Sequence, residues 1–409
     1  MTQNECRFCT TPLSHGFVDL GRTPLANAYL TEAQLNQPEP AYPLRAFVCH
    51  ECWLVQADAF VPPEEIFSDY AYFSSYSTSW VEHARRFTVM ARERFGLTAS
   101  SQVVEVASND GYLLRHFVEA GIPVLGVEPA QNVAETARAI GVPTECLFFG
   151  RETARNLVAA GKSADLVIGN NVLAHVPDIN DFVGGLAAIL KPDGVVSVEF
   201  PHLLQLMQET QFDTVYHEHF YYLSLLAVER IFRTHGLQVF DVEQLLTHGG
   251  SLRVMASLAT SHAHTVTENV SRIRQLEDDY GFGTVAVYER FQAQVSPIRE
   301  GLLAFLDKAK AENKTVVAYG AAAKGNTLLN FCGVGTDRID YVVDRNPHKQ
   351  GHYLPGSHLP ILPPEEMLAT RPDYVLILPW NLKNEIVSDY DLSVWGGRYV
   401  VAIPELTVL

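Results

Sequence analysis

Four consecutive residues, Tyr216-His-Glu-His219, form the densest group of proton-transfer side chains in the sequence. A histidine titrates near neutral pH, a neighbouring glutamate can orient or polarise it, and a tyrosine can donate a hydrogen bond to a developing oxyanion. We therefore interpret the Tyr216–His219 segment as a general acid–base group. Because His217 and His219 would share a face in a strand, metal binding by this pair is an alternative.

The residues that follow indicate how this segment is positioned. Phe220-Tyr-Tyr-Leu-Ser224 predicts extended backbone that leads to a helix N-cap, with Leu225 as the first helical residue. A loop at the top of a sheet would let the side chains of the Tyr216–His219 segment converge on one pocket.

A parallel sheet is predicted upstream, where residues 102–199 alternate short apolar runs with helical stretches. Strands at this spacing, bounded by Gly and Pro, indicate βαβ units that bind ligands at the carboxyl ends of the strands. The predicted strands are Gln102–Ala107, Pro123–Glu128, Ala164–Gly169 and Gly194–Glu199.

The loop after the first predicted strand, Glu105-Val-Ala-Ser-Asn-Asp-Gly111, lacks the second glycine of G-x-G-x-x-G and is a poor pyrophosphate cradle. An acidic residue followed by a turn of small residues instead resembles the first motif of class I S-adenosylmethionine-dependent methyltransferases. In that family the loop passes under the amino acid part of the cofactor. The resemblance implies that Glu128, which ends the second strand, accepts hydrogen bonds from the ribose hydroxyls.

Four of the six cysteines fall in two pairs, Cys6-x-x-Cys9 and Cys49-x-x-Cys52. Two such knuckles can complete a tetrahedral shell of four thiolates around zinc, which leaves no open position for substrate. We therefore predict a structural zinc site, with His50 as a spare ligand. Unligated thiols or a redox pair are the alternatives.

Two further segments have two interpretations each. Asp69–Ser77 contains four aromatic residues with serines, and it is either a packed linker or a lid whose tyrosines reach cofactor and substrate. His248-Gly-Gly-Ser-Leu-Arg253 is either a plain hairpin turn or a site of close backbone approach, with Arg253 available to an anion.

A second doubly wound pattern follows a polar helical span at about residues 262–312. The turn Gly320-Ala-Ala-Ala-Lys-Gly-Asn-Thr327 opens a helix, and its amides and Lys324 suit a phosphate. Asp344 stands where an NAD-binding fold would place its ribose acid, although G-x-G-x-x-G is again missing. The predicted strands are Lys314–Gly320, Ile339–Asp344, Asp373–Leu378 and Tyr399–Ile403.

Taken in order, the cysteine pairs, Tyr72-Phe-Ser-Ser75, the Glu105–Gly111 loop, the Tyr216–His219 segment and the Gly320 turn resemble the three-domain sugar C-methyltransferases of deoxysugar biosynthesis. The resemblance runs from Cys6 almost to the C-terminus. It implies methyl transfer from S-adenosylmethionine to C3′ of a TDP- or CDP-linked 4-keto-6-deoxy sugar, through an enolate.

The same resemblance implies roles for individual residues. His219 is the base, Glu218 orients it, Tyr216 lines the site, and His175 or Tyr70 serves the C4′ oxygen or a proton relay. The implied cofactor-binding residues are Tyr72, Ser75, Glu105, Ala107, Asn109, Asp110, Gly111, Glu128, Pro129, Asn132, Phe148, Asn170 and Asn171. The implied substrate-binding residues are Tyr76, His217, Tyr222, His248, Ser251, Arg253, Lys324 and Asn326.

The expected fold class is α/β: a small N-terminal zinc-binding domain with an aromatic linker (1–80), a class I methyltransferase Rossmann-like domain (81–255) and a second Rossmann-like C-terminal domain (256–409). The net charge of −17 over 409 residues makes nucleic acid an unlikely partner. We expect a cytoplasmic protein without a membrane span, plausibly a monomer, because the sequence shows neither a signal peptide nor a long apolar run. An O- or N-methyltransferase of another small metabolite and a non-catalytic zinc-containing binding protein are the alternative functions.

Overall fold

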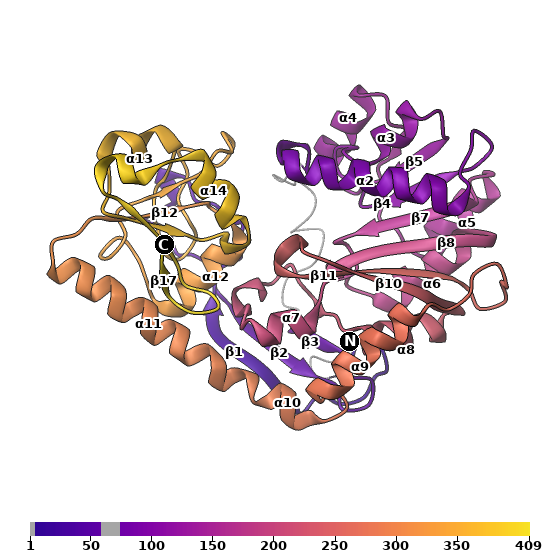
Figure 1. Ribbon diagram of the computed structural model, residues 1–409, viewed down its shortest axis with the longest axis horizontal. Helices are drawn as coiled ribbons and strands as arrows, with labels where there is room; N and C mark the ends of the chain where they lie inside the picture. The colour runs from indigo at the N-terminus through magenta and orange to yellow at the C-terminus, as the bar shows by residue number, and fades with distance from the viewer. Residues whose placement is uncertain (1–4, 59–73) are drawn as a thin grey trace.

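The computed structural model describes residues 5–58 and 74–409, which form three sheets (Figure 1). The N-terminal sheet has the strand order β1-β2-β3-β9 and is antiparallel throughout. Its strands are β1 (His15–Thr23), β2 (Tyr42–Val48), β3 (Val55–Ala57) and β9 (Tyr221–Tyr222). Because β9 follows the Tyr216–His219 segment directly, pairing of Tyr221 with Gln56 ties that segment to the N-terminal domain.

The middle sheet has seven strands in the order β10-β11-β8-β7-β4-β5-β6. Its strands are β4 (Val103–Val106), β5 (Val124–Val127), β6 (Thr144–Glu145), β7 (Ala164–Asn170), β8 (Leu190–Pro201), β10 (Leu237–Leu245) and β11 (Ser251–Leu258). The five strands β4 to β8 are parallel, as predicted, and β10 and β11 are antiparallel additions. The order reverses between β4 and β7, so the loops after these two strands diverge and leave room for a ligand.

Helices cover this sheet. They are α2 (Thr78–Phe95), α3 (Leu114–Glu119), α4 (Gln131–Ala139), α5 (Arg151–Ala159), α6 (Ile179–Ile189), α7 (Leu203–Gln208) and α8 (Leu225–Thr234). The predicted N-cap is confirmed: the Ser224 hydroxyl accepts a hydrogen bond from the Ala227 amide, and α8 begins at Leu225.

The C-terminal sheet has the order β14-β13-β12-β15-β16-β17, with only the β16–β17 pair antiparallel. Its strands are β12 (Val316–Tyr319), β13 (Val342–Val343), β14 (Ile361–Leu362), β15 (Tyr374–Ile377), β16 (Arg398–Val401) and β17 (Thr407–Val408). Among the helices that follow β11, α9 (Glu268–Tyr280) packs on β10 and α8 of the middle domain. The others are α10 (Val285–Glu289), α11 (Phe291–Ala311), α12 (Ala323–Cys332), α13 (Pro364–Thr370) and α14 (Lys383–Asp389). The predicted polar helical span is therefore α9 to α11.

One apolar core joins the N-terminal sheet to the C-terminal domain. Phe17 of β1 stacks on Phe291 of α11 with ring centroids 4.5 Å apart, and the same cluster includes Met207 of α7 and Leu328 of α12. Figure 1 shows β1 and β2 between α11 and the middle domain. The N-terminal domain is thus packed against both larger domains.

The middle sheet extends past the expected boundary at residue 255. Residue 255 lies inside β11, which pairs along its length with β8, so cutting there would leave an unpaired edge. Among the described residues, no helix is both long and apolar enough to cross a membrane.

Candidate active site

The four cysteines of the two knuckles converge. Cys6 Sγ lies 3.5 Å from Cys52 Sγ, Cys9 Sγ lies 3.5 Å from Cys49 Sγ, and all four sulfurs lie within 4.8 Å of one another. Sulfurs at about 2.3 Å from a central zinc would have this separation. His50 is not part of the group, so four thiolates make up the zinc site and close it to substrate.

The zinc site positions the segment that carries the predicted base. Arg7, between two of the ligands, donates hydrogen bonds to the carbonyls of Phe220 and Ala57. The Gln56 side chain accepts from the Arg7 amide and donates to Cys6 Sγ at 3.2 Å. Zinc coordination therefore fixes the backbone just after His219.

The rings of His219, Tyr216 and His175 form one cluster. The His219 centroid lies 3.9 Å from that of Tyr216 and 4.6 Å from that of His175. A turn closed by the His219 amide and the Tyr216 carbonyl brings Tyr216 and His219 to the same side. All three side chains are only partly buried, so they face a shared accessible space.

Hydrogen bonds set the tautomers of both histidines. His219 Nδ1 lies 2.8 Å from the Thr214 carbonyl, and His175 Nδ1 lies 2.9 Å from the Glu218 carbonyl. A carbonyl only accepts, so Nδ1 carries the proton in each ring and Nε2 is the basic nitrogen. A cavity of about 20 Å³, the size of one water, adjoins His219 beside Phe200 and Tyr222.

Burial and neighbouring charge keep these histidines neutral. Burial, the nearby His175 and the Lys324 charge hold the pKa of His219 well below its ordinary 6.5, against the Thr214 carbonyl, which raises it. Burial also lowers the pKa of His175 to about 4. At neutral pH His219 is thus unprotonated and able to act as a base.

Two residues of the Tyr216–His219 segment face away from this cluster, contrary to expectation. The carboxylate of Glu218 accepts a hydrogen bond from Asn27 Nδ2 at 2.7 Å, so Glu218 does not orient the His219 ring; the Thr214 carbonyl does. His217 Nε2 lies 3.1 Å from the Pro43 carbonyl, so His217 contacts the N-terminal domain instead of an open substrate site.

The reason is that the segment forms a turn, closed by the His219 amide and the Tyr216 carbonyl. Its side chains therefore do not alternate between two faces, as they would in a strand. The metal-pair interpretation is disfavoured for the same reason, because the His217 ring faces the Pro43 carbonyl and the His219 ring faces the Thr214 carbonyl.

The expected cofactor loop has strained backbone that brings polar groups together. Ala107, Asn109 and Gly111 have φ values of 53°, 50° and 78°, in the left-handed region. A Cβ on Gly111 would lie 3.0 Å from Val142 Cγ2, so glycine is required there. Glu105, 1% exposed, ends β4 beneath this loop.

Carboxylates and amides surround the loop. Glu128 accepts hydrogen bonds from the amides of Asn109 and Ala130, one on each oxygen, so it braces the loop. The Ser74 amide donates to Asn109 Oδ1 and the Ser75 amide donates to Asp110 Oδ2. The start of α2 is thereby held to the loop.

Burial and the charges of Asp110, Glu128 and Glu199 raise the pKa of Glu105 well above 4.5. Among the described residues, Glu105 Oε2 and the Oδ1 atoms of Asn170 and Asn171 are buried without a hydrogen-bond partner. These oxygens belong to residues at or next to the carboxyl ends of β4 and β7, the two neighbouring strands between which the strand order reverses. These acceptor oxygens fit a cationic, polyhydroxylated cofactor such as S-adenosylmethionine.

The other expected cofactor residues lie around this edge of the sheet. Pro129 follows β5, Asn132 is the second residue of α4, and Phe148, 50% exposed, lies in the loop after β6. Tyr76, at the end of the short helix η2 (Ser74–Tyr76), is 60% exposed. Tyr70 and Tyr72 lie outside the described residues.

Arg253 is already neutralised, so the expectation that it binds an anion is wrong. Its Nε lies 2.8 Å from Glu199 Oε1 and its Nη1 lies 2.6 Å from Glu243 Oε2, while His83 Nε2 lies 2.8 Å from Glu199 Oε2. The guanidinium is 93% buried in these pairs, and a phosphate would have to displace a carboxylate.

Ser251 and Tyr222 also serve the fold. The Ser251 hydroxyl donates to the Thr247 carbonyl and closes the turn before β11. The Tyr222 hydroxyl donates to the His219 carbonyl, and both side chains are almost fully buried. His248, in contrast, remains at the site: its Nε2 lies 3.1 Å from Asn171 Nδ2 and its ring lies 5.1 Å from that of Trp80.

The C-terminal domain presents Lys324 and Asn326 from the first turn of α12. Lys324 Nζ donates to Asn381 Oδ1 at 2.8 Å, and Asn326 is 1% exposed with its Oδ1 atom unpartnered among the described residues. Asp344 accepts hydrogen bonds from the amides of Ala321 and Asn346. The carboxylate therefore holds the Gly320 turn, which disfavours the NAD interpretation.

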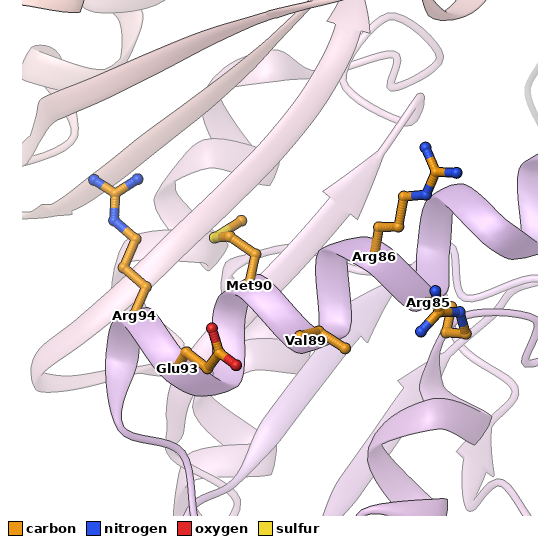
Figure 2. A pocket seen from close by; sticks show the side chains of 6 residues that line it. All are labelled: Arg85, Arg86, Val89, Met90, Glu93 and Arg94. Atoms are coloured by element: carbon orange, nitrogen blue, oxygen red, sulfur yellow. The ribbon is translucent and has the colours of Figure 1, made fainter.

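A shallow hollow elsewhere on the surface takes no part in this site. It lies along α2 and is lined by Arg85, Arg86, Val89, Met90, Glu93 and Arg94 (Figure 2). Its arginines pair with Glu82 and Asp241, and the hollow contains none of the residues expected for catalysis.

Sequence reasoning did not find several residues that build the site: Asn27, Arg7, His83, Asp213 and Trp380. Each contacts a site residue that is far away in the sequence, so spacing carries no signal for it. The one local signal that could have found His83 is its position three residues after Trp80, which places both rings on one face of α2.

Comparisons with known proteins agree with this architecture. Three family models match: "Putative zinc binding domain" at residues 6–67, "Methyltransferase domain" at 80–242 and "C-methyltransferase C-terminal domain" at 246–404. C-methyltransferase NovU from Streptomyces niveus is 37% identical over 407 residues, covering 99% of this chain and 97% of that protein. A ubiquinone biosynthesis O-methyltransferase from Bartonella bacilliformis is 26% identical over 110 residues, 26% of this chain and 44% of that protein.

Solved structures match just under half of the chain. The PH0226 protein from Pyrococcus horikoshii is 14% identical, with a TM-score of 0.37, and the match covers 49% of this chain and 100% of that one. Magnesium protoporphyrin IX methyltransferase from Synechocystis with bound S-adenosylmethionine is 15% identical, with a TM-score of 0.33, over 44% of this chain and 77% of that one.

The match to NovU spans almost the whole of both chains and therefore shows the family, whereas the partial matches do not. Together with the Rossmann-like middle domain, the cysteine site and the C-terminal domain, it shows that the chain belongs to the C-methyltransferase family that includes NovU and is a zinc-containing, S-adenosylmethionine-dependent enzyme.

Proposed function

We propose that the enzyme methylates C3′ of a nucleotide-linked 4-keto-6-deoxy sugar, with His219 as the base. The observation that carries the proposal is the cluster of His219, His175 and Tyr216, with the His219 proton fixed on Nδ1 by Thr214. Family membership supplies carbon as the acceptor atom. Carbon next to a ketone is acidic enough to be deprotonated by a positioned histidine when donors stabilise the enolate.

The proposed reaction has two steps. His219 Nε2 takes the proton from C3′, and the electron pair of that C–H bond moves into the enolate, whose charge lies on the C4′ oxygen. C3′ then forms a bond to the methyl carbon as the methyl–sulfur bond breaks, which regenerates the ketone. Bound S-adenosylmethionine supplies the electrophilic methyl group and leaves as S-adenosylhomocysteine.

The residues around His219 suit this chemistry. The Tyr216 ring lies beside the His219 ring, where its hydroxyl can donate to the C4′ oxygen, and the His175 ring lies on the cluster as a proton-relay group. Neutral His175 carries its proton on Nδ1, bonded to the Glu218 carbonyl, and burial lowers its pKa to about 4, so its Nε2 is free to accept a proton in a relay. We assign the nucleotide diphosphate to the C-terminal domain, where Lys324 and the amides at the start of α12 present positive charge.

The test is methyl transfer to defined sugars. Purified protein is incubated with S-adenosylmethionine labelled in its methyl group and a panel of TDP- and CDP-linked 4-keto and 4-hydroxy sugars, and products are examined by NMR. We expect label on C3′ of a 4-keto sugar and none on the 4-hydroxy sugars, which cannot form the enolate. Label on oxygen or nitrogen, or cofactor binding without any sugar accepted, would refute the proposal.

A further inference from the structure

Two hydrogen bonds from the C-terminal domain hold the backbone that orients His219. Trp380 Nε1 donates to Asp213 Oδ2 at 2.8 Å, and the Thr327 hydroxyl donates to the Val215 carbonyl at 3.1 Å. Thr214, whose carbonyl fixes the His219 tautomer, lies between these two anchored residues. The orientation of the base is thus set from the C-terminal domain.

Asp213 is unusually enclosed for a carboxylate. It is 0% exposed in the short helix η3 (Phe212–Thr214), and its Oδ1 atom has no hydrogen-bond partner among the described residues. Burial raises the pKa of Asp213 to about 6, while Lys324 and the Trp380 N–H lower it. The amides of Asp213 and Thr214 also lower this pKa, but a buried carboxylate remains costly unless a cation compensates for its charge.

Lys324 is that cation. Its Nζ lies 4.5 Å from the ring centroid of Trp380 and donates to Asn381, the next residue of the same short helix η5 (Trp380–Leu382). Trp380 therefore contacts both charges: its N–H faces Asp213 and its ring supports Lys324. Burial lowers the pKa of Lys324, and Asp213 opposes that shift.

The other titratable groups that face Lys324 are His219 and His248, since its charge lowers the pKa of each. Both histidines are neutral at pH 7 because burial also disfavours their charged forms. Asp213 is consequently the group that supports the positive charge of Lys324.

We propose that Asp213 is a positioning residue that acts with Trp380: it keeps Lys324 protonated and in place while it anchors the backbone that orients His219. The contact between Asp213 and Trp380, called the junction below, then positions Lys324 of the C-terminal domain together with His219 of the methyltransferase domain. The part of this inference that concerns substrate rests on the proposed function, in which Lys324 binds the nucleotide diphosphate.

Competitive chemical labelling of lysines tests the charge on Lys324 without substrate. The protein is acylated with a trace amine reagent across a pH series, and mass spectrometry gives the labelling midpoint of Lys324. Asp213→Asn keeps an oxygen that can accept from Trp380 but removes the charge, so the midpoint should fall by roughly half a unit to one unit. The exposed Lys310 of α11 is the internal reference. An unchanged Lys324 midpoint would overturn the inference.

A pair of tryptophan variants separates the junction from general damage. Trp380→Phe removes the N–H donor to Asp213, and Trp395→Phe removes an N–H donated at 3.0 Å to the Pro372 carbonyl in the same domain. Only Trp380→Phe should lower the Lys324 midpoint, because the indole N–H no longer fixes the Asp213 carboxylate, whereas phenylalanine still offers Lys324 an aromatic ring. Equal effects of the two variants, or none, would contradict the inference, and this pair also serves if Asp213→Asn does not fold.

Kinetics then link the junction to the reaction. The alkaline limb of kcat/KM for the nucleotide sugar should move to lower pH in Asp213→Asn by the same amount as the Lys324 midpoint. A shifted midpoint in a protein that methylates no sugar would support the inference and refute the proposed function. Sugar methylation combined with an unshifted Lys324 midpoint in Asp213→Asn would support the proposed function and refute the inference.

Discussion

Replacing Glu218 by Gln should change the stability of the enzyme in a pH-dependent way. Glu218 is 5% exposed, and burial raises its pKa from 4.5 to about 7, while the Asn27 side chain and the Lys349 charge pull it down. Its folded pKa lies above its unfolded pKa, so the protonated carboxyl contributes stability that is complete below the unfolded pKa. That contribution is lost as pH rises through the folded pKa.

The size of the effect follows from the two pKa values. At about 1.36 kcal/mol per pKa unit, the full difference of about 2.5 units corresponds to about 3.4 kcal/mol. Between about pH 5 and about pH 8 the native protein should lose about 2.5 kcal/mol through this group, because part of the titration lies outside that window. Glutamine has the shape of the protonated glutamate and does not titrate, so the variant loses no free energy of unfolding at this position over the same pH range.

The assay is urea unfolding of the wild type and of Glu218→Gln at both pH values, with zinc present. Relative to wild type, the variant should be more stable at the higher pH than at the lower pH by about 2.5 kcal/mol. Glu209→Gln, which changes an exposed glutamate after α7, is the matched control and should show the same difference at both pH values. An equal difference for Glu218→Gln at the two pH values would refute the assignment of Glu218 as a buried carboxyl with a raised pKa.

Four further outcomes are expected. Cys52→Ser should lose bound zinc, measured by atomic absorption, and should lower the melting temperature; retained zinc would exclude the four-thiolate site. His219→Gln should lower kcat by about 10²- to 10⁴-fold with the affinity for S-adenosylmethionine unchanged by calorimetry. The wild-type kcat/KM should hold on the acid side until below pH 6.5, because the His219 pKa lies well below that value. Glu128→Gln loses one of two amide hydrogen bonds and should weaken cofactor binding by about 10- to 100-fold, whereas unaltered binding would remove Glu128 from the cofactor site.

The sequence predicted the fold well where local signals are strong. Strand spacing at residues 102–199 and from residue 314 onward carries a period that depends only on nearby residues, and the predicted strands form in both sheets. The further strands of these sheets, β6, β10, β11, β14 and β17, were not among the predicted strands. The cysteine pairs also carry their own signal, because a knuckle is built from four consecutive residues. The strand after the Tyr216–His219 segment and the N-cap at Ser224 were predictable for the same reason.

The roles of single side chains were harder to predict. Glu218 and His217 turn toward the N-terminal domain because the segment is a turn closed by a backbone hydrogen bond, and a strand-like pattern in the sequence hides this. Arg253 looks like an anion ligand until Glu199 and Glu243, distant in the sequence, are placed beside it. Asp213 and Trp380 are 167 residues apart, so their pairing depends on how two domains pack.

The central claim is that His219 removes a proton from the carbon that becomes methylated. The direct measurement is hydrogen exchange at C3′ of the accepted nucleotide 4-keto sugar, followed by NMR in deuterated water with S-adenosylhomocysteine in place of the methyl donor. Wild-type enzyme should introduce deuterium at C3′, and His219→Gln, folded and still binding cofactor, should not. Equal exchange by the two proteins, or methylation without any exchange at C3′, would contradict the account.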